Sequence, residues 1–81
     1  MKLPRDISAE TLIKMLGKLG YQISRQKGSH IRLTAKLEDA EHHITIPNHS
    51  PIKIGTLNNI LNDISQKNKI TKEEIIKLIS F

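Results

Sequence analysis

The spacing of apolar residues changes twice along this chain, and this change restricts the fold more than any other feature. Apolar residues recur every three or four positions near both ends, but every second position between residues 21 and 46. The first spacing is typical of one face of a helix and the second of one face of a strand. The order predicts an α+β fold, α-β-β-β-α-α, in which helices cover one face of a three-stranded antiparallel sheet.

The boundaries of the first two helices are marked by capping and polar residues. Ser8 can cap the first helix, and Gly20 is expected to end it in a left-handed conformation. The second helix should begin near Gly55 and Thr56 and end in the polar stretch 65–69.

A third helix has the best-defined start in the chain. Thr71 and Glu74 form a capping box, and Ile70 and Ile75 have the spacing of a hydrophobic staple around it. The buried face of this helix is expected to consist of Ile75, Ile76 and Ile79.

The three expected strands have one apolar and one polar face. The residues expected to face the helices are Tyr21, Ile23, Ile31, Leu33, Ala35, Ile44 and Ile46. The residues expected on the open face are Gln22, Ser24, Gln26, His30, Arg32, Thr34, His43 and Thr45. The loop 47–51, which holds His49, has a proline at each end, so it cannot continue a central strand.

Length and composition exclude several classes of protein. With 81 residues, 37% of them hydrophobic and 26% charged, the chain should form one globular domain over residues 1–81. It has no cysteine, which excludes a disulfide framework and thiolate chemistry. No apolar run is long enough to cross a membrane, and polar residues interrupt the amino-terminal apolar positions, so we expect no membrane contact, no signal peptide and a cytoplasmic location.

The positive charge is concentrated in the first half of the chain. Residues 1–36 carry eight Lys and Arg against two acids, whereas residues 37–81 carry five against six. A clustered basic surface attracts polyanions by releasing counterions, so nucleic acid is the leading class of partner and an anionic membrane surface the weaker one. The only aromatic residues are Tyr21 and Phe81, which leaves almost no surface on which bases could stack.

The segment 25–32 is the best candidate for a functional site. It combines the cations Arg25, Lys27 and Arg32 with His30 and the flexible Gly28. Cleavage of an RNA phosphodiester needs a base, an acid and positive charge on the phosphorane, and a histidine can supply the first or the second near neutral pH. The residues allow a second interpretation, since Lys-Gly-Ser is also an ordinary hairpin turn and a single surface histidine is commonly inert.

The remaining histidines do not form a plausible metal site. His42 and His43 are adjacent on a strand and must point to opposite faces, and neither they nor His49 have Cys or carboxylate partners at ligand spacing. We therefore expect no metal and no other cofactor, and we interpret the acidic loop 38–41 as a solvated connection.

Several short motifs occur in a distinctive order along the chain. The motifs are Leu19-Gly20-Tyr21, Arg25 with Lys27-Gly28-Ser29-His30, Ile46-Pro47-Asn48-His49, Gly55-Thr56-Leu57 with Ile60-Leu61, and Ile70-Thr71-Lys72-Glu73-Glu74. Each motif is weak alone, but their order and spacing are specific, cover almost the whole chain and resemble the HicA-type (YcfA-like) toxins of toxin-antitoxin pairs. The chain departs from the family pattern at Tyr21, where many members have Trp or Phe, and in its more acidic loop before the third strand.

This resemblance implies a double-stranded-RNA-binding-domain-like fold and a function. The function would be that of an mRNA interferase, a metal-independent endoribonuclease that cleaves mRNA and is inhibited by a HicB-type antitoxin. On this mapping His30 is catalytic, and Gly28 and Ser29 form its supporting turn. Arg25, Lys27 and Arg32 would hold phosphate, and His49 would support RNA binding or order its own loop.

Two alternatives to an enzyme remain at this point. The first is a non-catalytic RNA-binding module of the same fold, but the start of the second helix offers only Lys53 where duplex binders carry several lysines. The second is an adaptor that binds only protein, which would leave the basic, histidine-bearing strand pair without a purpose.

Overall fold

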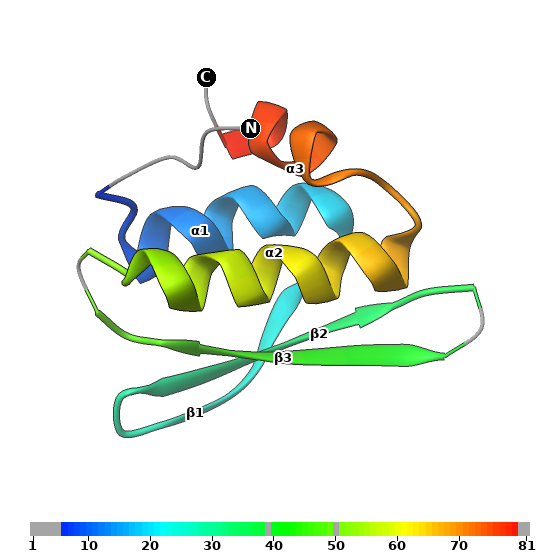
Figure 1. Cartoon of the computed structure of the whole chain (residues 1–81). Helices are drawn as coiled ribbons and strands as arrows, with labels where there is room; N and C mark the ends of the chain where they lie inside the picture. The colour runs from blue at the N-terminus through cyan, green and yellow to red at the C-terminus, as the bar shows by residue number, and fades with distance from the viewer. Residues whose placement is uncertain (1–5, 39, 50, 80–81) are drawn as a thin grey trace.

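The computed structural model describes residues 6–38, 40–49 and 51–79, with only the backbone described for residues 78 and 79. The elements, in chain order, are α1 (Ala9–Leu16), the short 3₁₀ helix η1 (Gly17–Leu19), β1 (Gln22–Lys27), β2 (His30–Lys36), β3 (Glu41–Pro47), α2 (Ile54–Asn68) and α3 (Lys72–Ile79). The sheet forms one layer, α1 and α2 lie side by side over one of its faces, and α3 lies beyond them on the side away from the sheet (Figure 1). The predicted α-β-β-β-α-α order is confirmed.

The sheet is antiparallel throughout, with the strand order β1-β2-β3. The pairing of β2 with β3 is regular over seven residue pairs, from His30 opposite Pro47 to Lys36 opposite Glu41. The pairing of β1 with β2 contains one irregularity between Ile23 and Arg25, a β-bulge at Ser24. Both β1 and β3 are therefore edge strands, but only β3 has a regular backbone along its whole length.

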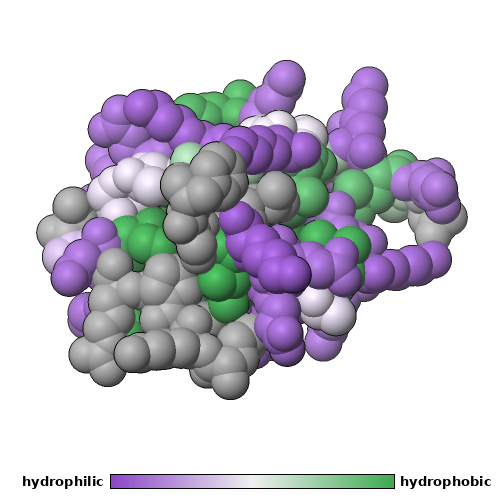
Figure 2. All heavy atoms as spheres, turned by 90° about the horizontal axis from the view of Figure 1, so that it is seen from above, coloured by the Kyte–Doolittle hydropathy of each residue, from purple (hydrophilic) through white to green (hydrophobic). Residues whose placement is uncertain are grey.

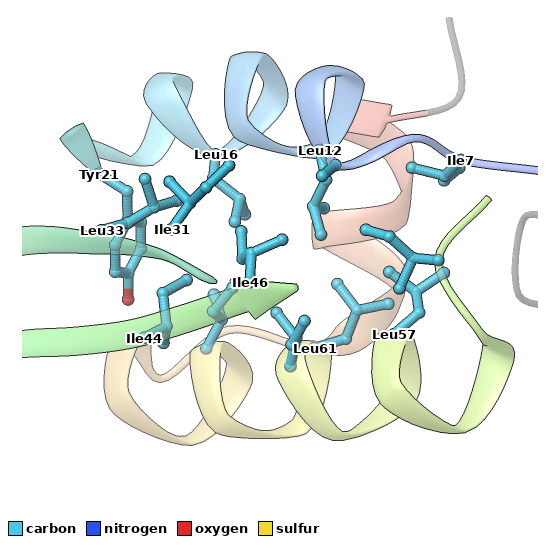
Figure 3. Packing of buried hydrophobic residues seen from close by; sticks show 14 of the residues in the cluster. Ile7, Leu12, Leu16, Tyr21, Ile31, Leu33, Ile44, Ile46, Leu57 and Leu61 are labelled. Atoms are coloured by element: carbon cyan, nitrogen blue, oxygen red, sulfur yellow. The ribbon is translucent and has the colours of Figure 1, made fainter. Parts of the chain in front are cut away.

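An aliphatic core fills the space between the sheet and the helices. Leu12 and Leu16 from α1 point toward Ile46 of β3, and Leu57 and Leu61 from α2 close the core from the other side (Figure 3). All five side chains are buried. Since burying a side chain of this size contributes roughly 1.5 to 3 kcal/mol, the two helices and the sheet stabilise one another mainly through this layer.

The predicted helix caps are largely present. The Ser8 hydroxyl accepts a hydrogen bond from the Thr11 N–H at 3.1 Å, and Gly20 has a φ of 92°, the left-handed conformation expected after the first helical segment. At the start of α3 the Thr71 hydroxyl accepts from the Glu74 N–H at 3.1 Å. Of the expected buried face of α3, Ile75 is fully buried and Ile76 partly buried, whereas the Ile79 side chain lies outside the described residues.

The second helix ends in the polar stretch 65–69, as the sequence predicts. It continues through Asn68 and is capped by Lys69, which adopts a left-handed φ of 57°. Polar side chains stabilise the last turn: Asn68 Nδ2 donates to the Ile64 carbonyl at 2.9 Å, and the Ser65 hydroxyl donates to the Ile70 carbonyl. Side-chain hydrogen bonds therefore compensate for the weak helix preference of these polar residues.

Two residues of β1 differ from the sequence-based expectation, Ile23 in its exposure and Gln26 in its face of the sheet. Ile23 pairs with the buried Leu33 and lies on the same face of the sheet, yet it is 53% exposed, because β1 is an edge strand and the helices do not cover it there. Gln26 pairs with Ile31 and so lies on the helix-side face, not on the open face, because the extra residue at Ser24 reverses the alternation that follows it.

The outer surface on the helix side is largely hydrophilic. Viewed from above the helices, polar and charged side chains cover much of the molecule, with apolar side chains showing between them (Figure 2). Among the described residues, no helix has the length and hydrophobicity needed to cross a membrane.

Candidate functional site

A two-residue turn places Lys27 and His30 opposite each other. Gly28 and Ser29 connect β1 to β2, and Gly28 has a φ of 57°, a conformation that glycine adopts without steric cost. Glycine with positive φ at the first of two loop positions is typical of a type II′ hairpin turn, whose twist matches that of the strands. The turn thus fixes His30 at the start of β2, directly across from Lys27.

The bulge at Ser24 brings the remaining cations to the same face. Beyond it, Arg25 pairs with Arg32, so the two guanidinium groups and His30 share the face opposite the core. The Ser24 hydroxyl holds the bulge by donating to the Arg32 carbonyl at 3.3 Å and accepting from the Thr34 hydroxyl at 2.8 Å. Strict alternation would have turned Arg25 and Lys27 toward the helices, so the bulge assembles the site.

These side chains line one open hollow on the sheet face. It has a volume of about 210 Å³ and is lined by Arg25, Lys27, His30, Arg32 and Thr45. Four of the five were singled out from the sequence. Thr45 was placed on the open face but not in the site, although its position opposite Arg32 follows from the same period-two pattern.

The hollow is strongly and uniformly positive. Within the described part of the chain none of its three cations forms an ion pair, and no acidic side chain lines it. Arg25 and Arg32 are direct cross-strand neighbours, an arrangement of like charges that destabilises a sheet. A multiply charged anion seated between them would relieve this repulsion.

Three predicted site residues, Gly28, Ser29 and His49, do not line the hollow. Gly28 and Ser29 form the turn at its end. His49 is exposed beyond the end of β3, where its carbonyl accepts from the Ala9 N–H at 3.2 Å and its N–H donates to the Pro47 carbonyl at 2.8 Å. The neighbouring Asn48 N–H donates to the Ser29 carbonyl at 2.6 Å, so this loop is fastened to the turn through its backbone.

A second polar cluster is buried on the opposite face of the sheet. His42, only 7% exposed, lies with its Nδ1 2.6 Å from the Tyr21 hydroxyl and its Nε2 3.2 Å from the Asp63 carboxylate. Asn68 Nδ2 donates to the Tyr21 oxygen at 2.9 Å. Burial raises the pKa of the Tyr21 hydroxyl above its ordinary value of 10, the Asn68 hydrogen bond lowers it, and the negative charge of Asp63 raises it further.

The hydrogen bonds of this cluster assign the proton on His42. The Tyr21 oxygen already accepts from Asn68, and its own proton needs a buried acceptor, which among the described residues only His42 Nδ1 offers at hydrogen-bond distance. His42 therefore carries its proton on Nε2 and donates it to Asp63. From the sequence we evaluated His42 only as a possible metal ligand. Its position on the same strand face as Ile44 and Ile46 already indicates a buried residue.

The described residues contain no cluster of three His, Cys, Asp or Glu side chains that could hold a metal ion. The three histidines of the β3 region instead have different surroundings. His42 is buried, His43 lies on the open face with its Nδ1 2.8 Å from Thr34 Oγ1, and His49 lies in the loop after the strand.

The fold and the hollow define a class of protein: an α+β domain whose fold is like that of a double-stranded-RNA-binding domain, with a basic, histidine-bearing sheet face. The family described as HicA toxin of bacterial toxin-antitoxin matches residues 9–65. The chain belongs to this family, and it is the toxin of a toxin-antitoxin system with an antitoxin as its partner. No curated protein and no solved structure matches it. The third helix, α3, lies beyond the matched range.

Proposed function

We propose that the chain is a metal-independent endoribonuclease that cleaves mRNA at the basic hollow and is inhibited by a HicB-like antitoxin. The observation that carries the proposal is the exposed imidazole of His30 among three unpaired cations. A structural role would require partners, yet no described residue forms a hydrogen bond or ion pair with the side chains of these four residues. A phosphate with an attacking hydroxyl beside it is the substrate that this set of groups fits.

In this proposal each residue has one task. Arg25 and Arg32 bind the phosphate and stabilise the charge of the phosphorane. Lys27 approaches the phosphate from β1, across from His30 on β2. His30 takes the proton of the ribose 2′-hydroxyl as its oxygen attacks phosphorus. The bond from phosphorus to the 5′-oxygen breaks, and that oxygen receives a proton from water, which reaches the open hollow. The products are a 2′,3′-cyclic phosphate and a free 5′-hydroxyl.

Replacing His30 tests the catalytic part of the proposal. His30→Ala should abolish cleavage while keeping the fold and most of the RNA affinity, because the cations supply the attraction and the imidazole only the proton transfer. The matched control is His43→Ala, which removes another exposed histidine from the same sheet face about 13 Å further along the strands. That variant should cleave like the unmodified protein.

The charges and the absence of a metal requirement are tested separately. Arg32→Ala should weaken RNA binding and reduce the salt dependence of affinity by about one unit of slope. Cleavage should continue in the presence of a chelator. If the unmodified protein binds RNA but leaves it intact under every condition, the chain is a non-catalytic RNA-binding module, and the enzymatic proposal is wrong.

We expect the antitoxin to recognise the positive charge of the hollow. An acidic surface opposite Arg25 and Arg32 would associate quickly with the hollow and exclude RNA from it. Masking of the site in this way predicts that His30 becomes inaccessible in the complex, which chemical modification of histidine can measure in the free and bound protein.

A further inference from the structure

The free edge of β3 carries hydrogen-bonding groups that the sheet does not use. In an antiparallel pair, residues alternate between those bonded to the partner strand and those whose N–H and C=O point away from it. The Leu37 N–H donates to the Ala40 carbonyl at one end of the β2–β3 pair, and the Asn48 N–H donates to the Ser29 carbonyl at the other. Counting along the register from either bond identifies the same residue pairs as hydrogen-bonded between β2 and β3.

This alternation determines which groups face outward. His42, Ile44 and Ile46 are bonded to β2, whereas the N–H and C=O of Glu41, His43 and Thr45 point to the free edge. Within the described part of the chain, no backbone partner is present for these outward groups. Pro47 also occupies an outward position, so the N–H that proline lacks is not needed for a bond to β2.

The two edges of the sheet differ in how they resist pairing with another chain. Proteins usually protect an edge strand with a bulge, with lysine or with a short length. The β1 edge has the bulge at Ser24 and the cations Arg25 and Lys27. The β3 strand has seven residues, an unbroken register and no Lys or Arg.

A groove runs beside the β3 edge and would accommodate an added strand. The groove has a volume of about 340 Å³. Residues 43–45 of β3 line one side of it, and Thr56, Asn59 and Asp63 of α2 line the other. Side chains on one face of an added strand would enter this groove, and those on its other face would extend the open face of the sheet.

The basic hollow specifies the charge of the added strand. Thr45 lines both the hollow and the groove, and it pairs with Arg32. An added strand lies about 5 Å beyond β3 and about 10 Å from β2, so a long acidic side chain beside Thr45 can reach toward Arg32 over the small threonine. A second copy of this chain fits less well, because joining two β3 edges would place two positive hollows on one continuous sheet face.

We propose that the antitoxin docks by adding an extended, acidic segment to the β3 edge as a fourth strand of the sheet. This inference deepens the proposed function, since the added strand would be the element that carries carboxylates to the hollow. It takes from the family assignment only that an antitoxin exists.

Amide hydrogen exchange on the complex tests the proposal directly. The probe is the cognate antitoxin of this toxin, co-expressed and purified with it. The amides of Glu41, His43 and Thr45 should exchange at least tenfold more slowly in the complex than in the free toxin, while the outward amide of Gln26 on the β1 edge should not change. Equal exchange rates at His43 and Thr45 in the two states would overturn the proposal.

A pair of variants separates the backbone from the side chain. His43→Pro removes one outward N–H without removing a bond to β2 and should weaken antitoxin binding about tenfold or more, whereas His43→Ala should bind nearly normally. Gln26→Pro places the same residue at the outward position of the other edge and should also bind normally. Circular dichroism checks that each variant folds, and the exchange experiment does not depend on any of them.

The remaining outcomes are also distinguishable. Dimerisation of the free toxin with the same three amides protected would assign the edge to a second copy and overturn the docking of the antitoxin there. Slow exchange at the edge in a toxin that never cleaves RNA would leave the docking intact and refute only the enzymatic proposal.

Discussion

The buried Tyr21–His42 pair offers a sharp test of how the interior is stabilised. Tyr21→Phe removes one oxygen atom and changes the packing little, but it deletes two hydrogen bonds, at 2.6 Å to His42 and 2.9 Å from Asn68. Asn68 keeps its bond to the Ile64 carbonyl, whereas His42 Nδ1 loses the one hydrogen-bond partner that the described residues give it. A net hydrogen bond contributes about 1 kcal/mol and an orphaned buried acceptor costs about 1 to 3 kcal/mol.

The free energy of unfolding should therefore fall by about 2 kcal/mol. For a domain of this size, this change corresponds to a decrease in Tm of roughly 8 to 16 °C. Urea unfolding followed by circular dichroism measures it. The matched control is His43→Ala, which removes an exposed imidazole whose Nδ1 lies 2.8 Å from Thr34 Oγ1 on the open face, where water replaces the lost partner. That substitution should stay within about 0.5 kcal/mol of the unmodified protein. If Tyr21→Phe is equally neutral, the buried network does not stabilise the fold.

The same hydroxyl predicts a dependence of stability on alkaline pH. Burial, the largest cause, and the charge of Asp63 raise the pKa of Tyr21 in the folded state above 10, so folding favours the protonated hydroxyl. Its contribution is fully present below pH 10 and is lost as the pH rises through the pKa of the folded state. The difference in unfolding free energy between the unmodified protein and Tyr21→Phe should therefore shrink above pH 10. A difference that stays constant to higher pH would contradict the assigned environment.

Three further predictions concern the turn, the last helix and the antitoxin. Gly28→Ala should cost about 1 kcal/mol in thermal unfolding, because the added methyl group meets open space and only the φ of 57° opposes it. Thr71→Ala should cost about 1 kcal/mol by removing the cap that accepts the Glu74 N–H, and an unchanged Tm would mean that α3 adds nothing to the fold. Arg25→Glu combined with Arg32→Glu should slow association with the antitoxin and weaken the salt dependence of that rate, which stopped-flow measurements can determine.

Much of the fold could be predicted because the two periodicities are undisturbed in most elements. Each turn of α1 and every second pair of β2 with β3 places an apolar side chain where the period expects one, and the core residues follow directly. The end of α2 could be predicted from its polar residues, but the contact that stabilises its last turn could not. Asn68 donates to the Tyr21 hydroxyl, and local composition does not indicate a contact between two residues so far apart in the sequence.

The candidate site was predicted from residue types, but the way it is assembled was not. Period two alone separates Arg25 and Lys27 from His30 and Arg32 by placing the two pairs on opposite faces. A single extra residue at Ser24 unites them, and the signal in the sequence is only one serine within a polar strand. The bulge depends on hydrogen bonds to Arg32 and Thr34 of the neighbouring strand, so it becomes visible only when the strands are paired.

The bulge at Ser24 has two consequences, one for the open face of the sheet and one for its β1 edge. It turns Arg25 and Lys27 onto the open face, which concentrates positive charge there, and it interrupts the backbone of the edge on which both residues lie. An incoming strand therefore meets a broken edge with two cations at β1 and a regular edge without Lys or Arg at β3. Because Thr45 lies on β3 directly opposite Arg32, the edge that can accept a strand is also the edge from which the hollow can be covered. The bulge thus leaves RNA and the antitoxin with different proposed binding surfaces, the open face for RNA and the β3 edge for the antitoxin. An antitoxin strand on the β3 edge would still lie close enough to cover the hollow.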